Sequence, residues 1–312
     1  MKRIFCVLLC LALCLCAGCS ADTKQTKTIF AMDTVMELTV WGKDGQLAIE
    51  QVDSLLTQLE KKWSCKEADS LLSQLNRGEE PALTEEEKTL LKDIDALSGV
   101  TGGAFDPKLG AVSQLWGFTE DVHSVPSAVA IADAIAMEQW DLGAAIKGYA
   151  GQQAVSILEE LDVDRALLNL GGNVQTYGEK PDGTAWNIGI QNPDGGDTIG
   201  VVAVQGTASI VTSGDYQRFF EADGVRYHHI IDPETGCPAD SGLRSVTVIC
   251  TDGLKADVLS TALFVMGLEK GADFWRQSGD FEAVFITADG TIYATAGVAL
   301  SGCEYEVIGH EN

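Results

Sequence analysis

The segment GLKADVLSTALFVMG, residues 253–267, has the spacing of a helix that is apolar on nearly every side. Such a helix has to be buried among other elements, which limits the folds open to the chain. The segment nevertheless carries one carboxylate, Asp257, and two hydroxyls, Ser260 and Thr261. A buried carboxylate without a partner is costly or becomes protonated, so something should compensate Asp257.

Two interpretations of Asp257 are open from spacing alone. Asp257 and Thr261 are four positions apart and therefore share one helical face. Mg²⁺ accepts both a carboxylate oxygen and a threonine hydroxyl, typically beside substrate phosphates. Alternatively, Asp257 lies near the start of the helix and caps it, or interacts favourably with the helix dipole.

The N-terminus has the pattern of a secretory signal. Lys2 and Arg3 precede an apolar run, residues 4–17, that is too short to span a bilayer comfortably. We interpret residues 1–18 as a signal peptide. Its end, LCAGC, resembles a bacterial lipobox, which would make Cys19 a lipidated first residue that anchors the protein to a membrane surface. A plain signal peptide with another cleavage site is the alternative.

The expected organisation is therefore a lipoprotein signal peptide at 1–18, a polar tether at 19–28 and one catalytic unit at 29–312. The expected location is extracytoplasmic, anchored by lipid to the bacterial cell membrane. The formal net charge of −25 argues against a nucleic-acid partner, because phosphate neutralisation needs Lys and Arg. Outside the signal and Cys19 the cysteines lack zinc-ligand spacing, and no disulfide pair can be chosen from the sequence. These are Cys65, Cys237, Cys250 and Cys303.

Hydrophobic periodicity predicts mixed helices and strands without regular alternation, which indicates an α+β fold. We expect helices at 47–63, 84–97, 127–137 and 144–161, and strands at 29–41, 166–170, 228–231 and 245–250. Residues 282–287 and 291–296 should form a hairpin. No Walker, GxGxxG or GxSxG motif is present, so an NTPase, a Rossmann dinucleotide site and a serine hydrolase are not supported.

Lys147 and the histidine pair are further candidates. Lys147 lies early in the helix expected from 144, where it would serve as an anion site or simply be solvated. His228 and His229 are adjacent in an expected strand, so they should face opposite ways. One of them becomes a general-base candidate only if it reaches the metal site.

Seven ordered motifs resemble the ApbE family of FAD:protein FMN transferases. They are MDT (32–34), TGGAFDP (101–107), DLGAAIKGYA (141–150), NLGGN (169–173), TSGDYQRFF (212–220), YHHIIDPETG (227–236) and ADVLSTALFVMG (256–267). The resemblance implies a single ApbE-like catalytic unit, related to the T-fold, with two interleaved lobes. It also implies Mg²⁺-dependent transfer of FMN from FAD to a Thr or Ser hydroxyl of a target protein, with a phosphoester product and release of AMP.

The resemblance also assigns the site residue by residue. His229 is the expected base and His228 its structural neighbour, while Ser260 stands where some members have a further carboxylate. The implied metal ligands are Asp257, Thr261 and the carbonyl of Ala144. The implied flavin and phosphate contacts are Met32, Ala104, Phe105, Asp106, Asp141, Lys147 and Ile231, with Asn173, Ser213 and Tyr216 as pocket wall. Some members carry an aromatic residue after a pair equivalent to Trp63-Ser64, but here Cys65 and Lys66 follow, which places FAD affinity in question.

Two other functions share these motifs. A Mg²⁺-dependent FAD pyrophosphatase would use water in place of the acceptor hydroxyl, and a non-catalytic flavin-binding lipoprotein would be expected to lack the metal or base residues. The acceptors implied by the resemblance are flavoprotein subunits of membrane electron-transfer complexes, such as sodium-pumping quinone reductase or ferredoxin-dependent complexes. Residues 95–101, DALSGVT, loosely resemble the family's acceptor motif, Asp-x-x-Ser-Gly-Ala-Thr, and we interpret that likeness as chance.

Overall fold

A nine-stranded, mostly antiparallel sheet forms the centre of the computed structural model, which describes residues 23–120 and 123–310. Its strand order is β1-β2-β3-β4-β7-β10-β11-β12-β14. The strands are β1 (Lys24–Ala31), β2 (Thr34–Gly42), β3 (Val163–Asn169), β4 (Asn173–Tyr177), β7 (Ala208–Gly214), β10 (Leu243–Cys250), β11 (Glu282–Thr287), β12 (Ile292–Thr295) and β14 (Glu306–Ile308). The α+β prediction is confirmed.

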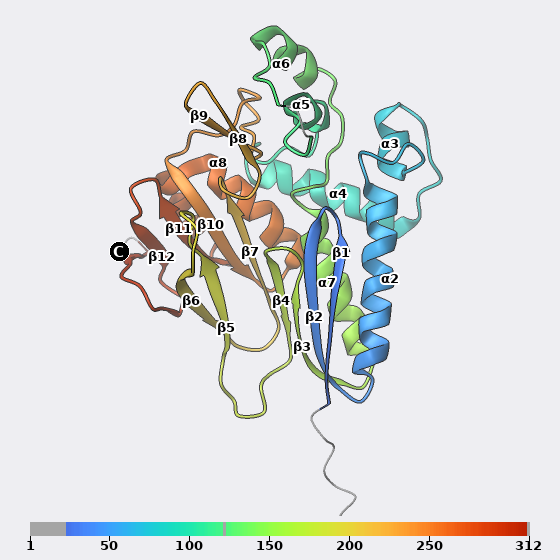
Figure 1. Cartoon of the computed structure of the whole chain (residues 1–312), viewed down its shortest axis with the longest axis vertical. Helices are drawn as coiled ribbons and strands as arrows, with labels where there is room; N and C mark the ends of the chain where they lie inside the picture. Colours follow the sequence, from blue (N-terminus) through green and yellow to red (C-terminus); the bar gives the residue numbers. More distant parts are fainter. Residues whose placement is uncertain (1–22, 121–122, 311–312) are drawn as a thin grey trace, which may run out of the picture.

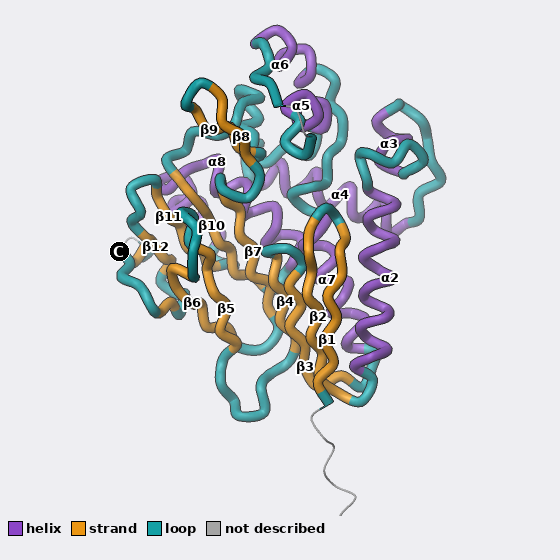
Figure 2. Tube along the Cα trace, viewed as in Figure 1, coloured by secondary structure: helices purple, strands orange, loops and turns teal. Residues whose placement is uncertain are grey.

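Helices pack on one face of this sheet, and a small sheet packs on the other (Figures 1 and 2). The small sheet has the order β13-β6-β5, from β5 (Trp186–Gln191), β6 (Thr198–Val204) and β13 (Leu300–Ser301). The helices are α2 (Gly45–Trp63), α3 (Leu71–Asn76), α4 (Glu85–Val100), α5 (Gly110–Trp116), α6 (Ala128–Ile135), α7 (Ile146–Glu159) and α8 (Gly253–Ser278). In the part of the chain that the structure covers, no helix is both long and apolar enough to cross a bilayer.

The buried faces explain why the helices lie where they do. The inner face of β2, with Met36, Leu38 and Val40, packs against α2 and α7 in one apolar core. A second core joins β10 and β11 to α8, and it contains Phe264 and Phe285. The expected apolar helix is confirmed as the first part of α8, which kinks at Gly267, where φ is 77°, before it continues to Ser278. Burial on several sides therefore holds α8 against both the sheet and α7.

Local signals predicted several elements correctly. The capping box of α4 is present, with the Thr84 hydroxyl accepting from Glu87 N–H and the Glu87 carboxylate accepting from Thr84 N–H. The hairpin of β11 and β12 is also confirmed. The expected strand at 228–231 was wrong in extent, because β9 (Val225–His228), which pairs with β8 (Phe219–Ala222), ends at His228. Ile231 forms only an isolated bridge to Pro238.

The first strand region differs from the sequence-based expectation. Residues 24–28, expected to be tether, belong to β1, and the single strand expected at 29–41 is a hairpin of β1 and β2. The turn is made by Met32 and Asp33, both in the left-handed region with φ of 50° and 58°. No glycine marks this turn, so residues 31–34 carry no strong turn signal. Residues 1–18 and Cys19, the expected signal and lipid site, lie outside the described residues.

Candidate active site

Asp257 is buried where the start of α8 meets the start of α7. Its side chain is almost fully enclosed, with the residue 4% exposed. The cap of α8 is Asp252, whose Oδ1 accepts Lys255 N–H at 2.9 Å, so Asp257 does not cap its own helix. Instead, Asp257 Oδ2 accepts the backbone N–H of Gly148 at 2.8 Å, near the start of α7. The helix-cap interpretation is therefore wrong for α8, although Asp257 does meet the positive end of a neighbouring helix.

Two glycines permit this contact. A Cβ on Gly148 would lie 2.1 Å from the Gly253 carbonyl and 2.6 Å from Asp257 Cβ. A Cβ on Gly253 would lie 2.4 Å from the Gly148 carbonyl. Only glycine at both positions lets the two backbones approach this closely. The packing thus brings a carboxylate to Gly148 from more than a hundred residues further along the chain.

The contact also affects Ala144. In a continuous helix, Gly148 N–H would bond to the carbonyl four residues earlier, which belongs to Ala144. Here α7 begins only at Ile146, and Gly148 N–H goes to Asp257. Within residues 23–120 and 123–310, no hydrogen bond ends on the Ala144 carbonyl. That oxygen and the Asp257 carboxylate are therefore two acceptors with unused capacity beside the first turn of α7.

The polar environment of Asp257 is incomplete. Burial raises the pKa of Asp257, and this effect is opposed by the charge of Lys147, the Gly148 N–H and the Asn173 amide. Asn173 lies beside the carboxylate and is 1% exposed, yet neither of its amide atoms has a partner with full hydrogen-bond geometry among the described residues. No Lys or Arg forms an ion pair with Asp257 in that same part of the chain. A bound cation would satisfy what these groups lack.

Hydroxyls line the next turn of α8. Ser260 Oγ donates to the Asp257 carbonyl at 2.8 Å and also lies 2.8 Å from Ser213 Oγ on β7. Thr261 Oγ1 lies 3.3 Å from the same Ser213 oxygen. The structure therefore brings Ser213 to the turn of α8 that carries Ser260 and Thr261, and it brings Asn173 to Asp257. In the described residues no group of three or more His, Cys, Asp or Glu side chains could hold a metal, and the implied ligand set contains only one such residue.

The adjacent histidines have different roles in the structure. His228 is buried, with its Nε2 3.1 Å from the Ala239 carbonyl and its Nδ1 accepting Ile230 N–H at 3.3 Å. A carbonyl can only accept, so Nε2 carries the proton and both ring nitrogens are used. His228 also packs edge-on against Phe264. It is a structural residue, as expected.

His229 retains a free ring nitrogen. Its Nδ1 lies 3.3 Å from the Arg218 carbonyl, which fixes the proton on Nδ1 and leaves the Nε2 lone pair available. Its side chain is half-buried. Burial, followed by the nearby charges of Arg218, His228 and Lys147, lowers the pKa of His229 to about 3. The imidazole is therefore neutral at physiological pH and able to accept a proton.

Two cations lie in this region without a carboxylate partner. Lys147 and Arg218 are partly buried, and neither forms an ion pair with any described residue. The charge of Lys147 acts on both Asp257 and His229, so it lies within electrostatic range of each. Arg218 was missed by sequence reasoning, although it stands in the TSGDYQRFF motif. The pair forms a positive region suited to phosphate oxygens.

The remaining candidate residues form the neighbouring wall. Met32, Ala104 and Phe105 contribute to the same apolar core as Ala144. Thr34 lies against Gly171, which joins the MDT and NLGGN motifs, and Met32 N–H donates to Glu60 Oε1 at 2.9 Å.

Asp106, Asp141 and Lys66 occupy loops of this wall. Asp141 N–H donates to the Pro107 carbonyl at 2.7 Å, next to Asp106. Lys66 Nζ reaches Asp33 Oδ2 at 2.9 Å. The Lys66 loop therefore meets the turn that carries Met32.

Two expected pocket residues lie slightly apart. Ile231 packs in a separate apolar cluster with Trp116 and Phe220, below α5 and α6. Tyr216 packs on Gly214, and its hydroxyl is buried without a hydrogen-bond partner in the described residues. Burial raises the pKa of Tyr216 to about 12. Their roles as flavin contacts stay predictions.

Comparison with known proteins gives consistent results. The protein-family model with the description "ApbE family" matches residues 32–285 of this chain. The FAD:protein FMN transferase of Treponema pallidum is 34% identical over an alignment covering 91% of this chain and 90% of that protein. The FAD:protein FMN transferase of Klebsiella pneumoniae is 36% identical, with 82% of this chain and 87% of that protein covered.

Solved structures share the fold over nearly their whole length. The crystal structure of the ApbE protein from Thermotoga maritima matches with a TM-score of 0.80 and 30% identity, covering 86% of this chain and 96% of that one. The apo flavinyl transferase ApbE of Pseudomonas stutzeri matches with a TM-score of 0.76 and 31% identity, covering 88% and 95%. On sequence, fold and motif placement together, the chain belongs to the ApbE family.

Proposed function

We propose that the chain is a flavin transferase that uses FAD as its substrate and moves FMN to a protein. In our proposal the acceptor group is a Thr or Ser hydroxyl and the other product is AMP. The acceptor oxygen forms a new bond to the FMN phosphorus, and the bond between that phosphorus and the bridging oxygen of the pyrophosphate breaks. AMP keeps the bridging oxygen, and the hydroxyl proton goes to His229.

The observation that carries this proposal is the state of His229. The Arg218 carbonyl holds its Nδ1 proton, so the free lone pair is at Nε2. Its ring is neutral at physiological pH, which is the form in which an imidazole accepts a proton. The charge of Lys147 acts on both His229 and Asp257, which supports a shared site for the proposed base and the carboxylate. A non-catalytic binding protein would have no need of this arrangement.

The residues around Asp257 fit Mg²⁺. Asp257, the Ala144 carbonyl and the Thr261 hydroxyl are all oxygen donors, which hard divalent cations prefer. The raised pKa of the buried carboxylate and the Ala144 oxygen without a hydrogen bond are unmet requirements that a cation would satisfy. When bound, Mg²⁺ would neutralise charge on the pyrophosphate. Lys147 and Arg218 supply further positive charge for the same group.

The proposed setting is the outer face of a bacterial membrane, with Cys19 as the lipid-bearing residue. The LCAGC sequence after a short apolar run supports this location. The acceptors would then be exported or membrane-bound flavoprotein subunits of electron-transfer complexes.

The test is incubation of the purified protein with FAD, MgCl₂ and an exported flavoprotein subunit carrying Asp-x-x-Ser-Gly-Ala-Thr. We expect the acceptor mass to increase by one FMN residue, and we expect replacement of its Thr by Ala to prevent this. FMN that appears only free in solution would support the FAD pyrophosphatase instead. No consumption of FAD would contradict both activities.

The chain's own DALSGVT segment should not be modified. Thr101 is 4% exposed, and its hydroxyl donates to the Ser98 carbonyl at 3.0 Å. The absence of FMN on Thr101 is a built-in control in the same mass spectrum.

A further inference from the structure

An exposed apolar pair lies at the end of the β1–β2 hairpin. Phe30 is 72% exposed and Val35 is 62% exposed, and the two residues stand directly opposite each other in the strand register. Both side chains are on the outer face of the sheet, away from α2. Exposed neighbouring apolar side chains on a chain with a net charge of −25 suggest a contact surface.

The backbone beside this pair is also open. β1 is the last strand at one edge of the nine-stranded sheet. Gly42 N–H donates to the Thr23 carbonyl at 3.3 Å, which marks 23 and 42 as a hydrogen-bonded pair. Bonded and non-bonded pairs alternate in an antiparallel ladder. The N–H and C=O groups of Thr26, Thr28 and Phe30 therefore point away from β2, toward the free edge.

The pair is close in sequence to the candidate site, and its turn is fixed in place. Met32, two residues after Phe30, belongs to the expected flavin wall. The turn is held by Glu60, which accepts Met32 N–H, and by Thr34 packed on Gly171. In Figure 1 this turn lies at the upper end of the hairpin, while the chain enters β1 at the lower end.

We propose that the outer edge of β1, with the Phe30–Val35 pair, is the docking surface for the acceptor protein, which adds an extended segment as a new strand. This inference rests on the proposed function, because FMN transfer requires a protein to approach the rim of the site. Main-chain hydrogen bonds to a sheet edge give affinity without a demanding sequence, and alternate side chains give specificity.

The surface also predicts the chemistry of the docking segment. An apolar side chain would pack on Phe30 and Val35. The next pair along the outer face is Thr28 with the exposed Glu37, so a basic side chain two positions further along the segment would be favoured. We expect an extended acceptor segment in which an apolar and a basic residue lie two positions apart. Both side chains would lie on the same outer face as Phe30 and Glu37, and the residue between them would point to the opposite face.

The chain's own N-terminal residues are a poor alternative occupant. From Lys24 to Phe30 the strand extends roughly 20 Å. If the chain is processed at Cys19, residues 19–23 could span only about 17 Å, and they begin at the far end of β1. A second copy of the chain is the other candidate, and the test separates it.

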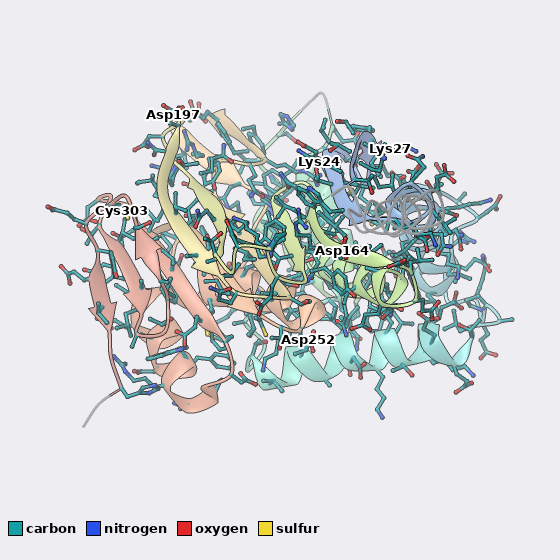
Figure 3. The ribbon with its side chains drawn as sticks, turned by 90° about the horizontal axis from the view of Figure 1, so that it is seen from below. Lys24, Lys27, Asp164, Asp197, Asp252 and Cys303 are labelled. Carbon is teal, nitrogen blue, oxygen red and sulfur yellow. The ribbon has the colours of Figure 1, made fainter. Side chains whose placement is uncertain are left out.

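The test uses two variants and a control. Phe30→Thr/Val35→Thr removes the apolar pair but keeps residues that favour strands. Thr28→Pro removes an outward N–H without breaking the ladder to β2. The control is Val307→Thr. Val307 is 63% exposed on β14, the strand at the opposite edge of the same sheet. The two edges lie on opposite sides of the molecule, as Figure 3 shows with Lys24 and Lys27 of β1 on one side and Cys303, near the C-terminal strands, on the other.

The acceptor is the exported flavoprotein subunit carrying Asp-x-x-Ser-Gly-Ala-Thr, assayed for FMN transfer and, with its Thr replaced by Ala, for binding. We expect both variants to raise the KM for the acceptor and its Kd at least about tenfold. FAD affinity and Tm should match the wild type, and Val307→Thr should behave as wild type.

Unchanged acceptor binding in both variants would overturn the proposal, and an effect of the apolar variant alone would overturn strand addition. A wild-type dimer that Phe30→Thr/Val35→Thr dissociates would assign the edge to a second copy. If wild-type protein binds the acceptor but transfers nothing, the docking surface stands and the proposed function fails.

Discussion

Two buried carboxylates in this protein have very different surroundings. Asp215, at the end of β7, is 8% exposed and accepts Arg244 Nε at 2.8 Å, with Arg226 Nη1 at 4.0 Å. Asp257, at the start of α8, is 4% exposed, and its neighbours are backbone N–H groups at the start of α7 and the Asn173 amide, with no ion pair among the described residues. Asp215 therefore receives its opposite charge from the fold, whereas Asp257 does not.

The difference supports our proposal that Asp257 is the functional carboxylate. The ion pair with Arg244 offsets part of the cost of burying Asp215, although Asp215 Oδ1 has no hydrogen-bond partner among the described residues, and we assign this carboxylate a structural role. Burial instead raises the pKa of Asp257, and the site beside it keeps a carbonyl and an amide with unused bonding capacity. Such incomplete compensation is typical of sites that bind a ligand.

The largest expected effect comes from Asp257→Ala. We expect FMN transfer to fall by about 10³-fold or more, because the proposed Mg²⁺ site loses the one carboxylate in its implied ligand set. The fold should persist, since Asp257 makes no ion pair that would be broken. The measurement is the rate of acceptor flavinylation, together with circular dichroism.

Asp215→Asn is the matched control for that variant. It should lower the free energy of unfolding by about 2 kcal/mol, because a charged hydrogen bond to Arg244 is lost. Transfer should stay close to wild type at a temperature where the variant is folded. Loss of transfer in a folded Asp215→Asn protein would erase the distinction between the two carboxylates.

The second prediction concerns the histidines. His229→Ala should slow transfer by about 10²- to 10³-fold, while the Kd for FAD changes little, because the ring acts on the acceptor proton. Single-turnover rates and FAD fluorescence titration separate the two effects. Equal losses in rate and affinity would instead make His229 part of the pocket wall.

The third prediction is the pH dependence of transfer. The folded pKa of His229, about 3, is below its unfolded value of 6.5. Below pH 6.5 the unfolded chain binds a proton at His229 that the folded chain does not. The contribution of His229 to the free energy of unfolding is therefore complete above pH 6.5 and is lost as the pH falls toward 3. We expect kcat/KM to show no histidine limb between pH 5 and 8, so an acid limb centred near 6.5 would contradict this assignment.

Much of the fold could be predicted from local pattern, whereas the long-range contacts that assemble the site could not. The capping box at Thr84 and the apolar periodicity of α8 are signals contained within a few turns. The contact of Gly148 with Asp257 depends on packing between helices about a hundred residues apart, which no local spacing reports. The β1–β2 hairpin was missed because Met32 and Asp33 make its turn without glycine.

The smallest expected effect is on FAD affinity. Lys66 pairs with Asp33, which lies beside Met32 of the expected flavin wall. Lys66→Tyr should lower the Kd for FAD by about three- to tenfold through ring stacking. Titration of FAD fluorescence gives the value, and a weaker affinity in Lys66→Tyr would show that the Lys66–Asp33 pair itself supports the pocket.

The central claim is that the missing partner of Asp257 is a divalent cation bound together with FAD. The most direct measurement is the Tm of wild type, Asp257→Asn and Asp215→Asn, each with FAD, as MgCl₂ is added at pH 7.5. We predict that Mg²⁺ raises the Tm of wild type and Asp215→Asn and leaves Asp257→Asn unchanged. An equal Mg²⁺-dependent rise in Asp257→Asn would contradict the claim.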